Sequence, residues 1–292
     1  MKEALFYQKG ASHQVRCGLC HHDCVLNKNK IGLCRVRQNI DGKLYSLNYG
    51  KIIANQIDPI EKKPLFHFLP GTNTYSLASL GCNFHCRHCQ NSDISQVTDD
   101  NFRANDSLPE IKPRQIVAAA QDNACPSISY TYTEPTIFVE FAYECMRLAQ
   151  SKGLKNIWVS NGYMSKNCLE TISNYLDAIN VDLKFFSDEN YQKICGARLQ
   201  PILDNLIWLV EHQIHLEVTT LIIPTLNDSD NELKKIAEFI ARHLGREIPW
   251  HVSAFHPDYQ LTELPPTPTP TIRRAQTIGR EAGLNYVYSG NT

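Results

Sequence analysis

The chain has 292 residues, of which 42% are hydrophobic and 20% charged, and its formal net charge is −1. This composition is typical of globular proteins, and the length is enough for one large domain and a small module. Lysine and arginine are scattered along the sequence, so we expect no nucleic-acid partner. No apolar run approaches the roughly 20 residues that cross a bilayer, and the polar amino terminus does not resemble a signal peptide. We therefore expect a cytoplasmic protein without a membrane partner.

The chain contains 11 cysteines. Because cytoplasmic thiols are kept reduced, an odd and clustered set favours metal ligation over a disulfide framework. Seven of them fall into two tight clusters, at residues 17–34 and 82–89. The other four are dispersed, and we expect them to be small buried apolar side chains: Cys125, Cys145, Cys168 and Cys195.

Residues 1–72 differ from the rest of the chain. They contain the first cysteine cluster, a hairpin pattern at 39–47 with an Asp-Gly turn, and a proline-containing connector at 58–64. From residue 73 onward, short apolar runs alternate with amphipathic helical patterns. We expect strands at 75–80, 127–132, 156–161, 178–184, 216–223, 250–256 and 285–289, helices at 137–149 and 229–244, and helix N-caps at Ser165, Ser187 and Asp228.

This alternation predicts an α/β fold with a parallel sheet and right-handed crossovers. We expect a partial (β/α)6-type TIM barrel over residues 73–292, preceded by a small Cys-rich N-terminal metal-binding module over residues 1–72. A doubly wound sheet is the alternative. In both architectures ligands bind at the carboxyl ends of the strands.

Cys82, Cys86 and Cys89 are spaced C-x3-C-x2-C directly after the first strand expected in the barrel. A zinc site normally has four ligands. A [4Fe–4S] cluster held by three thiolates instead keeps one iron free, which can chelate a small molecule through an amine and a carboxylate. Zinc with His85 or His88 as its fourth ligand is the alternative.

These cysteines resemble the signature of the radical S-adenosylmethionine (SAM) superfamily, C-x3-C-x-Φ-C, where Φ is aromatic and is here His88. The chain is similar to pyruvate formate-lyase activating enzymes, and in particular to the radical SAM enzyme of the AmmeMemoRadiSam system. The similarity rests on the segments CGLCHHDC, GKLYSLNYGK, DPIEKKPLFHFLPG, GCNFHCRHCQN, YTYTEP, SNGY, NVDLK and FHPDY. It implies a barrel of the radical SAM kind.

The resemblance also implies a reaction. A donor such as flavodoxin or ferredoxin reduces a [4Fe–4S] cluster on the three cysteines, bound SAM is cleaved to methionine and a 5′-deoxyadenosyl radical, and the radical takes a hydrogen atom from a substrate. The substrate is a protein glycine, as for activating enzymes, or else a small molecule or another protein, with Memo-like or AMMECR-like partners. A non-catalytic iron–sulfur or zinc protein in electron transfer or scaffolding is the alternative from another class.

Polar residues follow the expected strand ends, and the resemblance gives them roles toward SAM. Thr133 and Glu134 stand where the family holds the SAM ammonium group, although a helix N-cap is an alternative there. Ser160 and Asn161 face the ribose or the methionine carboxylate, or form a plain turn. The full set of expected cofactor-binding residues is Phe84, His88, Thr133, Glu134, Ser160, Asn161, Asp182, Lys184 and His256.

Asp182 and Lys184 fall on one face of their strand because side chains alternate along a strand. An acid and a base inside a barrel mouth are costly to bury unless they pair or bind something. We expect both in the active site as catalytic residues near SAM and the substrate, as the resemblance implies, and a structural ion pair is the alternative. His256 is a candidate pocket residue, against a loop histidine without such a role.

The N-terminal cluster Cys17-x2-Cys20-x3-Cys24-x9-Cys34 provides four thiols and predicts a second metal site. Zinc would stabilise a segment that is poor in apolar residues. A second iron–sulfur cluster would relay electrons. Four thiolates suit both metals, and the spacing does not separate them. His21 or His22 could replace one thiol.

Overall fold

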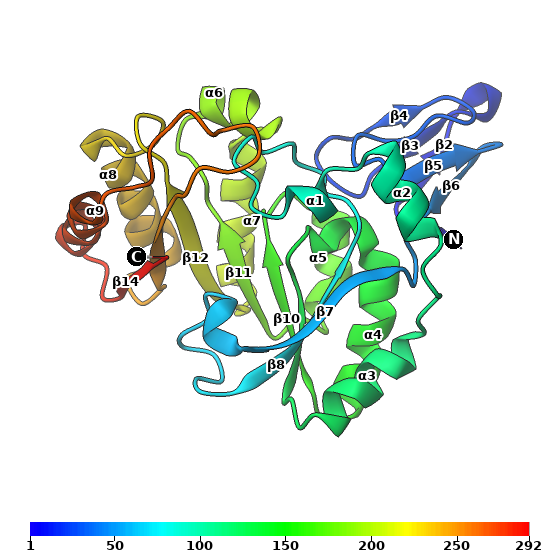
Figure 1. Ribbon diagram of the computed structural model, residues 1–292, viewed down its shortest axis with the longest axis horizontal. Coiled ribbons are helices and arrows are strands. Elements are labelled where there is room, and N and C mark those ends of the chain that lie inside the picture. The colour runs from blue at the N-terminus through cyan, green and yellow to red at the C-terminus, as the bar shows by residue number, and fades with distance from the viewer. Residues whose placement is uncertain (292) are drawn as a thin grey trace.

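The computed structural model describes residues 1–291, in which one eight-stranded sheet is flanked by helices and two small sheets lie toward the amino terminus (Figure 1). The strands of the large sheet are β7 (Ile52–Pro59), β8 (Asn73–Ser79), β9 (Ser127–Tyr130), β10 (Lys155–Ser160), β11 (Ala178–Asp182), β12 (His215–Ile222), β13 (Trp250–Ala254) and β14 (Val287–Gly290). The small sheets contain β1 (Lys2–Glu3), β2 (Tyr7–Lys9), β3 (Val15–Cys17), β4 (Val25–Leu26), β5 (Arg37–Ile40) and β6 (Lys43–Ser46).

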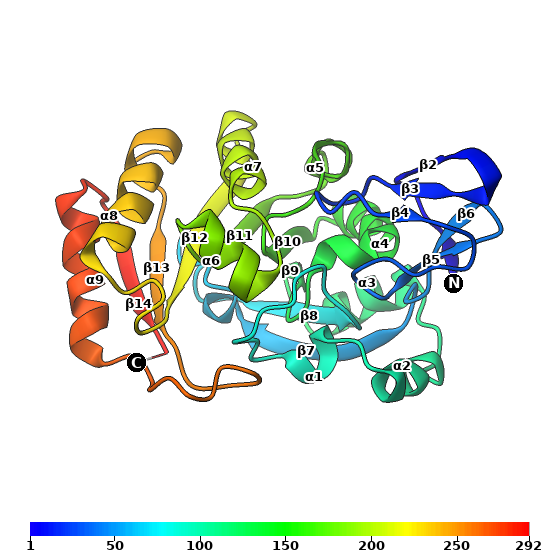
Figure 2. The same cartoon turned by 90° about the horizontal axis from the view of Figure 1, so that it is seen from above.

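The α-helices are α1 (Ser92–Ser95), α2 (Asp99–Asp106), α3 (Pro113–Asp122), α4 (Val139–Ser151), α5 (Lys166–Ser173), α6 (Asp188–Asn190), α7 (Gln200–Glu211), α8 (Asp230–Phe239) and α9 (Thr269–Glu281). Three short 3-10 turns, η1 (Ala11–His13), η2 (Ile60–Lys62) and η3 (Pro135–Phe138), and two π-helical turns, η4 (Tyr191–Cys195) and η5 (Ile240–Leu244), accompany them. Viewed from above, α5, α7, α8 and α9 lie along the outer side of the curved sheet (Figure 2).

The strand order is β14-β13-β12-β11-β10-β9-β8-β7. Strands β8 to β14 run parallel to their neighbours, whereas β7 pairs antiparallel with β8 at the edge. The prediction of a parallel, partial barrel is therefore confirmed. All strands from β8 to β13 point their carboxyl ends to one side, which is where a barrel of this kind binds its ligands.

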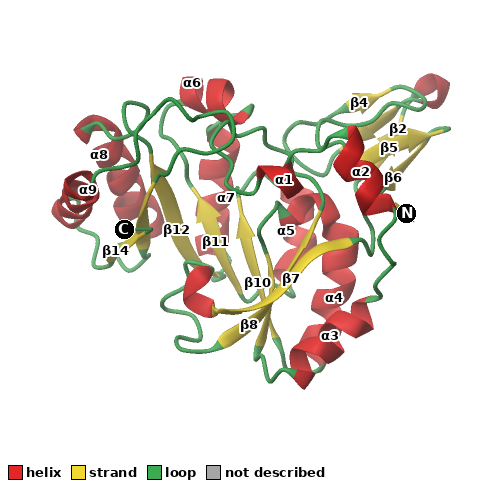
Figure 3. Cartoon of the chain, viewed as in Figure 1, coloured by secondary structure: helices red, strands yellow, loops and turns green. Residues whose placement is uncertain are grey.

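The N-terminal sheets lie at the opposite end of the molecule from β14 (Figure 3). The expected hairpin is present, with Ile40 paired to Lys43 across Asp41 and Gly42. Both turn residues have positive φ, 51° and 84°, as a type I′ turn requires. Strand β7, in contrast, lies before residue 72 but belongs to the large sheet. The division of the chain at residue 72 stays a prediction.

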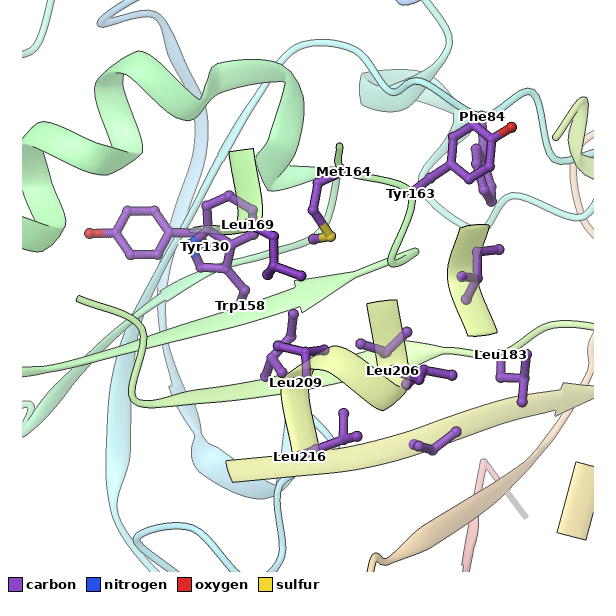
Figure 4. Packing of buried hydrophobic residues seen from close by; sticks show 14 of the residues in the cluster. Phe84, Tyr130, Trp158, Tyr163, Met164, Leu169, Leu183, Leu206, Leu209 and Leu216 are labelled. Atoms are coloured by element: carbon purple, nitrogen blue, oxygen red, sulfur yellow. The ribbon is translucent and has the colours of Figure 1, made fainter. Parts of the chain in front are cut away.

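Apolar side chains fill the space between the sheet and its outer helices (Figure 4). Trp158 on β10 is fully buried, and Leu206 and Leu209 of α7 pack into the same cluster as Leu216 of β12. Burying each such side chain contributes about 1.5–3 kcal/mol. Within residues 1–291, no helix is both long enough and apolar enough to span a membrane.

The structure corrects some boundaries. Ser165 and Ser187 cap α5 and α6 as predicted, but α8 is capped by Ser229, so the prediction of Asp228 as its cap is wrong. Asp228 instead accepts a hydrogen bond from the Thr225 backbone, 2.8 Å away, within the preceding turn. The expected connector at 58–64 forms the end of β7 followed by η2.

The segment of residues 64–68 closes the amino end of the barrel, where Leu65 packs with buried residues of β10 and β11 and two backbone groups hydrogen-bond to the buried Glu217 of β12. The backbone N–H groups of Phe66 and His67 donate to its carboxylate at 3.0 and 2.8 Å. The Nε2 atoms of His215 and His251 lie 3.1 and 2.7 Å from the same group. Burial alone would raise the pKa of Glu217, but these partners lower it to about 2.

Glu217→Gln tests this closure. A carboxyl group whose pKa falls from 4.5 to about 2 on folding adds stability above its unfolded pKa, and this stability is lost as the pH falls toward the folded value. Between about pH 5 and pH 2 the wild type should lose about 3 kcal/mol more free energy of unfolding than the variant, measured by urea denaturation. If the free energy of unfolding fell by the same amount in both proteins over this pH range, the Glu217 carboxylate would not stabilise the closure.

Candidate active site

A cavity of about 380 Å³ opens at the carboxyl ends of the parallel strands. Its volume lies within the range of about 300–1,000 Å³ that small-molecule sites occupy. Most of the residues predicted from the sequence line it: Cys82, Phe84, Cys86, His88, Cys89, Thr133, Glu134, Ser160, Asn161, Asp182 and Lys184. They come from the carboxyl ends of β10 and β11 and from the loops after β8, β9, β10 and β11, so the parallel topology brings together residues that are far apart in the sequence.

The loop that contains the three cysteines begins at Gly81, directly after β8. Gly81 has a φ of +107°, and a Cβ atom there would lie 3.0 Å from Val36, so a side chain is poorly tolerated. Farther along, the backbone N–H groups of His85 and Arg87 donate to carbonyl groups of η4, at 2.9 and 3.0 Å. The loop is therefore fixed at its start by the turn at Gly81 and in its middle by these two hydrogen bonds, while its thiols line the cavity.

Glu134, in the loop after β9, hydrogen-bonds to the carboxyl end of β10. Its carboxylate accepts hydrogen bonds from the Ser160 hydroxyl at 2.9 Å, from the Asn161 backbone N–H at 2.8 Å, and from the backbone and hydroxyl of Thr136. Burial raises the pKa of Glu134, and these donors oppose the rise. Glu134 is also the N-cap of η3, a position that the sequence suggested for Thr133. Thr133 instead donates its hydroxyl to the Ser79 carbonyl, at 2.7 Å.

Asp182 and Lys184 form an ion pair in the cavity wall, with 2.7 Å between Nζ and Oδ2. Burial acts to lower the pKa of Lys184, but Asp182 and the nearby thiols of Cys86 and Cys195 outweigh it and raise the pKa. Lys184 is therefore a cation at all physiological pH values. The pair is only partly exposed, 35% for Asp182 and 15% for Lys184, so a ligand in the cavity can reach both groups.

Two lining residues have polar atoms without a partner. The Nδ1 atom of His88 and the hydroxyl of Thr219 are buried and form no hydrogen bond within the described part of the chain. Burial, followed by the charge of Lys184, lowers the pKa of His88 to about 3, so this ring is neutral. Unpaired buried polar atoms are costly, which suits a cavity that binds a polar ligand.

The sequence did not indicate Lys63, which also lines the cavity. It is buried, pairs with Asp58 at 2.7 Å and lies 4.3 Å above the Tyr132 ring, whose hydroxyl group also donates to Asp58. The available signal was the segment DPIEKKP, in which two acids and two lysines are grouped with two prolines. His256, in contrast, is exposed and does not line the cavity, although its Nε2 atom lies 3.2 Å from the carbonyl of Asn291, which does.

Comparison with known proteins decides the family. Residues 77–240, more than half of the chain, match the model of the Radical SAM superfamily. The chain belongs to this superfamily. Membership implies a [4Fe–4S] cluster and SAM, and it indicates an enzyme.

This radical SAM protein is similar to two proteins to different degrees. It is 45% identical over 291 residues to an uncharacterized protein of Methanocaldococcus jannaschii, and the match covers 100% of this chain and 85% of that protein. It is 22% identical over 194 residues to the pyruvate formate-lyase-activating enzyme of Clostridium pasteurianum, over 63% of this chain and 80% of that enzyme.

Solved structures show the same fold. SuiB of Streptococcus suis, bound to S-adenosylmethionine, has a TM-score of 0.57 at 13% identity, over 73% of this chain and 48% of SuiB. A radical SAM methyltransferase from Sphaerobacter thermophilus has a TM-score of 0.56 at 14% identity, over 76% of this chain and 67% of that enzyme. At these identities the likeness concerns the fold alone.

The donor set fits the cluster that the superfamily implies. Within residues 1–291, no group of three or more His, Cys, Asp or Glu side chains is close enough to hold a single metal ion. In a [4Fe–4S] cluster each thiolate binds a different iron, so thiols arranged around a shared cavity are suitable. The Phe84 N–H lies 3.3 Å from the Cys82 sulfur, and the Ser95 hydroxyl lies 3.0 Å from the Cys89 sulfur. Hydrogen bonds to the sulfurs of a cluster change its reduction potential.

Glu134→Gln tests the strand connection at this site. The amide keeps the size of the side chain but replaces one acceptor oxygen with a donor. Either the Ser160 hydroxyl or the Asn161 N–H is then left without an acceptor. We expect the free energy of unfolding to fall by about 1–3 kcal/mol and the affinity for SAM to fall with it, because Asn161 loses its anchor. Anaerobic denaturation and equilibrium dialysis measure the two effects.

The matched control is Glu170→Gln on the exposed surface of α5, which should change neither quantity. Wild-type stability and SAM affinity in the Glu134→Gln protein would show that the connection is unimportant.

Proposed function

We propose that this radical SAM enzyme holds a [4Fe–4S] cluster on Cys82, Cys86 and Cys89 and binds SAM beside it, and that it abstracts a hydrogen atom from a substrate. The observation that carries the proposal is the convergence of these three thiols and the polar strand ends on one cavity. When bound there, the cluster and SAM supply an electron and a 5′-deoxyadenosyl radical. The protein itself contributes binding, orientation and exclusion of water.

The side chains around the thiols are suited to orienting SAM. The Asn161 amide lies 3.9 Å from the Cys82 sulfur and donates to the Asn83 side chain at 2.7 Å, so its position is fixed. Ser160, whose hydroxyl is held by Glu134, lies next to it. We assign Thr133, Ser160 and Asn161 to the polar groups of SAM, and Glu134 mainly to positioning them.

We further propose that the substrate is the backbone of a partner protein, with a glycine Cα as the hydrogen donor. A carboxylate accepts a hydrogen bond from an amide N–H and an ammonium group donates to a carbonyl, so the pair of Asp182 and Lys184 matches both ends of a peptide unit. The 22% identity to a pyruvate formate-lyase-activating enzyme supports this substrate class. A small one-electron carrier such as flavodoxin or ferredoxin would serve as the reductant.

The alternative is radical modification of a small molecule or of a Memo-like or AMMECR-like protein. A cavity of about 380 Å³ also suits a small substrate beside SAM. Phe84 and His88 line the cavity in either case, and we assign them to the adenine side of SAM.

Cys86→Ala tests the reaction. The variant lacks one cluster ligand, so the protein reconstituted with iron and sulfide and reduced with dithionite should no longer release 5′-deoxyadenosine from SAM, whereas the wild type should. Product release is measured by liquid chromatography under anaerobic conditions. Cys145→Ala removes an isolated buried thiol of α4 and should retain the wild-type rate. Equal product release by the wild type and Cys86→Ala would refute the proposed function.

The substrate class requires a separate measurement. The enzyme, SAM and a reductant are added to an anaerobic extract of host cells that lack this gene. A glycine substrate predicts a persistent protein radical in the electron paramagnetic resonance (EPR) spectrum, which disappears when Lys184→Ala replaces the wild type while dithionite-driven SAM cleavage continues. SAM consumption without a protein radical would favour the small-molecule alternative.

A further inference from the structure

The four N-terminal thiols line a second cavity. Cys17 lies at the end of β3, and the other three lie on the loops that follow, so the small sheets bring the thiols together. Arg37 of β5 and Asn83 also line this second cavity, which we call the thiol cavity. We call the cavity lined by Cys82, Cys86 and Cys89 the catalytic cavity, and residues 80–91, which contain these cysteines, the catalytic loop.

Two buried N–H groups at this cavity have no partner within residues 1–291: Nε of Arg37 and Nδ2 of Asn83. The rest of the Arg37 guanidinium pairs with Glu140 of α4 at 2.9 and 2.5 Å, and both side chains are only 1% exposed. These two free N–H donors, one of them on a guanidinium group, suit an anionic tetrathiolate centre, because a buried charge needs hydrogen-bond donors.

The second cavity lies directly against the catalytic one. Cys82 lines the catalytic cavity, while the next residue, Asn83, lines the thiol cavity, and consecutive Cα atoms are about 3.8 Å apart. Hydrogen bonds connect the two. His22 Nε2 lies 2.7 Å from the Asn83 carbonyl, and the Asn161 amide contacts both the Asn83 side chain and the Cys82 sulfur.

The thiol cavity lies near the surface. Leu33 lines it and is 51% exposed, and Cys20, Cys24 and Cys34 are themselves only partly buried. The four thiols are therefore close both to the surface and to the catalytic thiols, as an electron relay requires.

We propose that Cys17, Cys20, Cys24 and Cys34 hold a second [4Fe–4S] cluster that passes electrons to the cluster on Cys82, Cys86 and Cys89. This inference rests on the proposed function. Two anionic centres repel each other at short range whichever metal the second one holds. A redox centre makes use of this costly proximity, whereas zinc has no redox chemistry and does not.

The electron count is simple. A reduced flavodoxin or ferredoxin gives up one electron, which takes the N-terminal cluster from the 2+ to the 1+ state. The N-terminal cluster returns to 2+ as it reduces the catalytic cluster from 2+ to 1+. That cluster returns to 2+ when the electron enters the sulfonium of SAM. The C5′–S bond then breaks to give neutral methionine sulfur and the 5′-deoxyadenosyl radical, and no proton is transferred.

The test uses the full chain, reconstituted anaerobically with iron and sulfide, as the wild type and as Cys17→Ser/Cys20→Ser. The variant should contain half the iron and sulfide of the wild type. It should lose SAM cleavage driven by reduced flavodoxin but keep cleavage driven by dithionite, which reduces the catalytic cluster directly. Cys125→Ser, a buried thiol that lines neither cavity, is the matched control and should behave as the wild type.

Wild-type protein gives a result that does not depend on the variant's folding. Its reduced EPR spectrum should contain two cluster signals broadened by spin coupling between neighbours. Stoichiometric zinc with the iron of one cluster would overturn the proposal, and so would unchanged flavodoxin-driven cleavage in Cys17→Ser/Cys20→Ser. If the wild type releases no 5′-deoxyadenosine even with dithionite, the proposed function fails, while the iron content and the EPR spectrum still decide whether the second cluster exists.

Discussion

The proposed chemistry of this protein depends on three thiols of one short loop that line a common cavity. The thiols keep this arrangement only if the backbone of their loop is held in place. Here Gly81 supplies the turn after β8, and the N–H groups of His85 and Arg87 donate to η4. The π-helical turn η4 is followed by its C-cap residue Gly196, which has a φ of 72°, and two carbonyl groups of η4 accept these hydrogen bonds.

The positions of the active-site residues were predictable because parallel strands share an orientation. Each buried apolar run ends in polar residues, and the carboxyl ends of neighbouring strands meet at the same edge of the sheet. Glu134, Asn161 and Lys184, which come from three different loops, therefore line one cavity. The pairing of Asp182 with Lys184 follows from strand alternation in the same way.

Other features depend on contacts that leave no local pattern. Lys63 reaches the cavity only because β7 pairs antiparallel with β8, and nothing in residues 52–59 distinguishes an edge strand of the large sheet from a connector. Glu134 has partners from two strands, which spacing alone does not show. Asp228 and Ser229 are both good capping residues, and the choice between adjacent caps depends on the turn before the helix. His256 follows β13, but its side chain lies outside the cavity.

The central claim is that three thiolates leave one iron of the cluster free to bind SAM. The most direct measurement is electron–nuclear double resonance on the reduced, reconstituted protein with SAM labelled with ¹⁵N in its amino group and ¹⁷O in its carboxylate. Coupling of both labels to the cluster spin is the predicted result. A reduced cluster whose spectrum shows no coupling to either label at saturating SAM would contradict the claim.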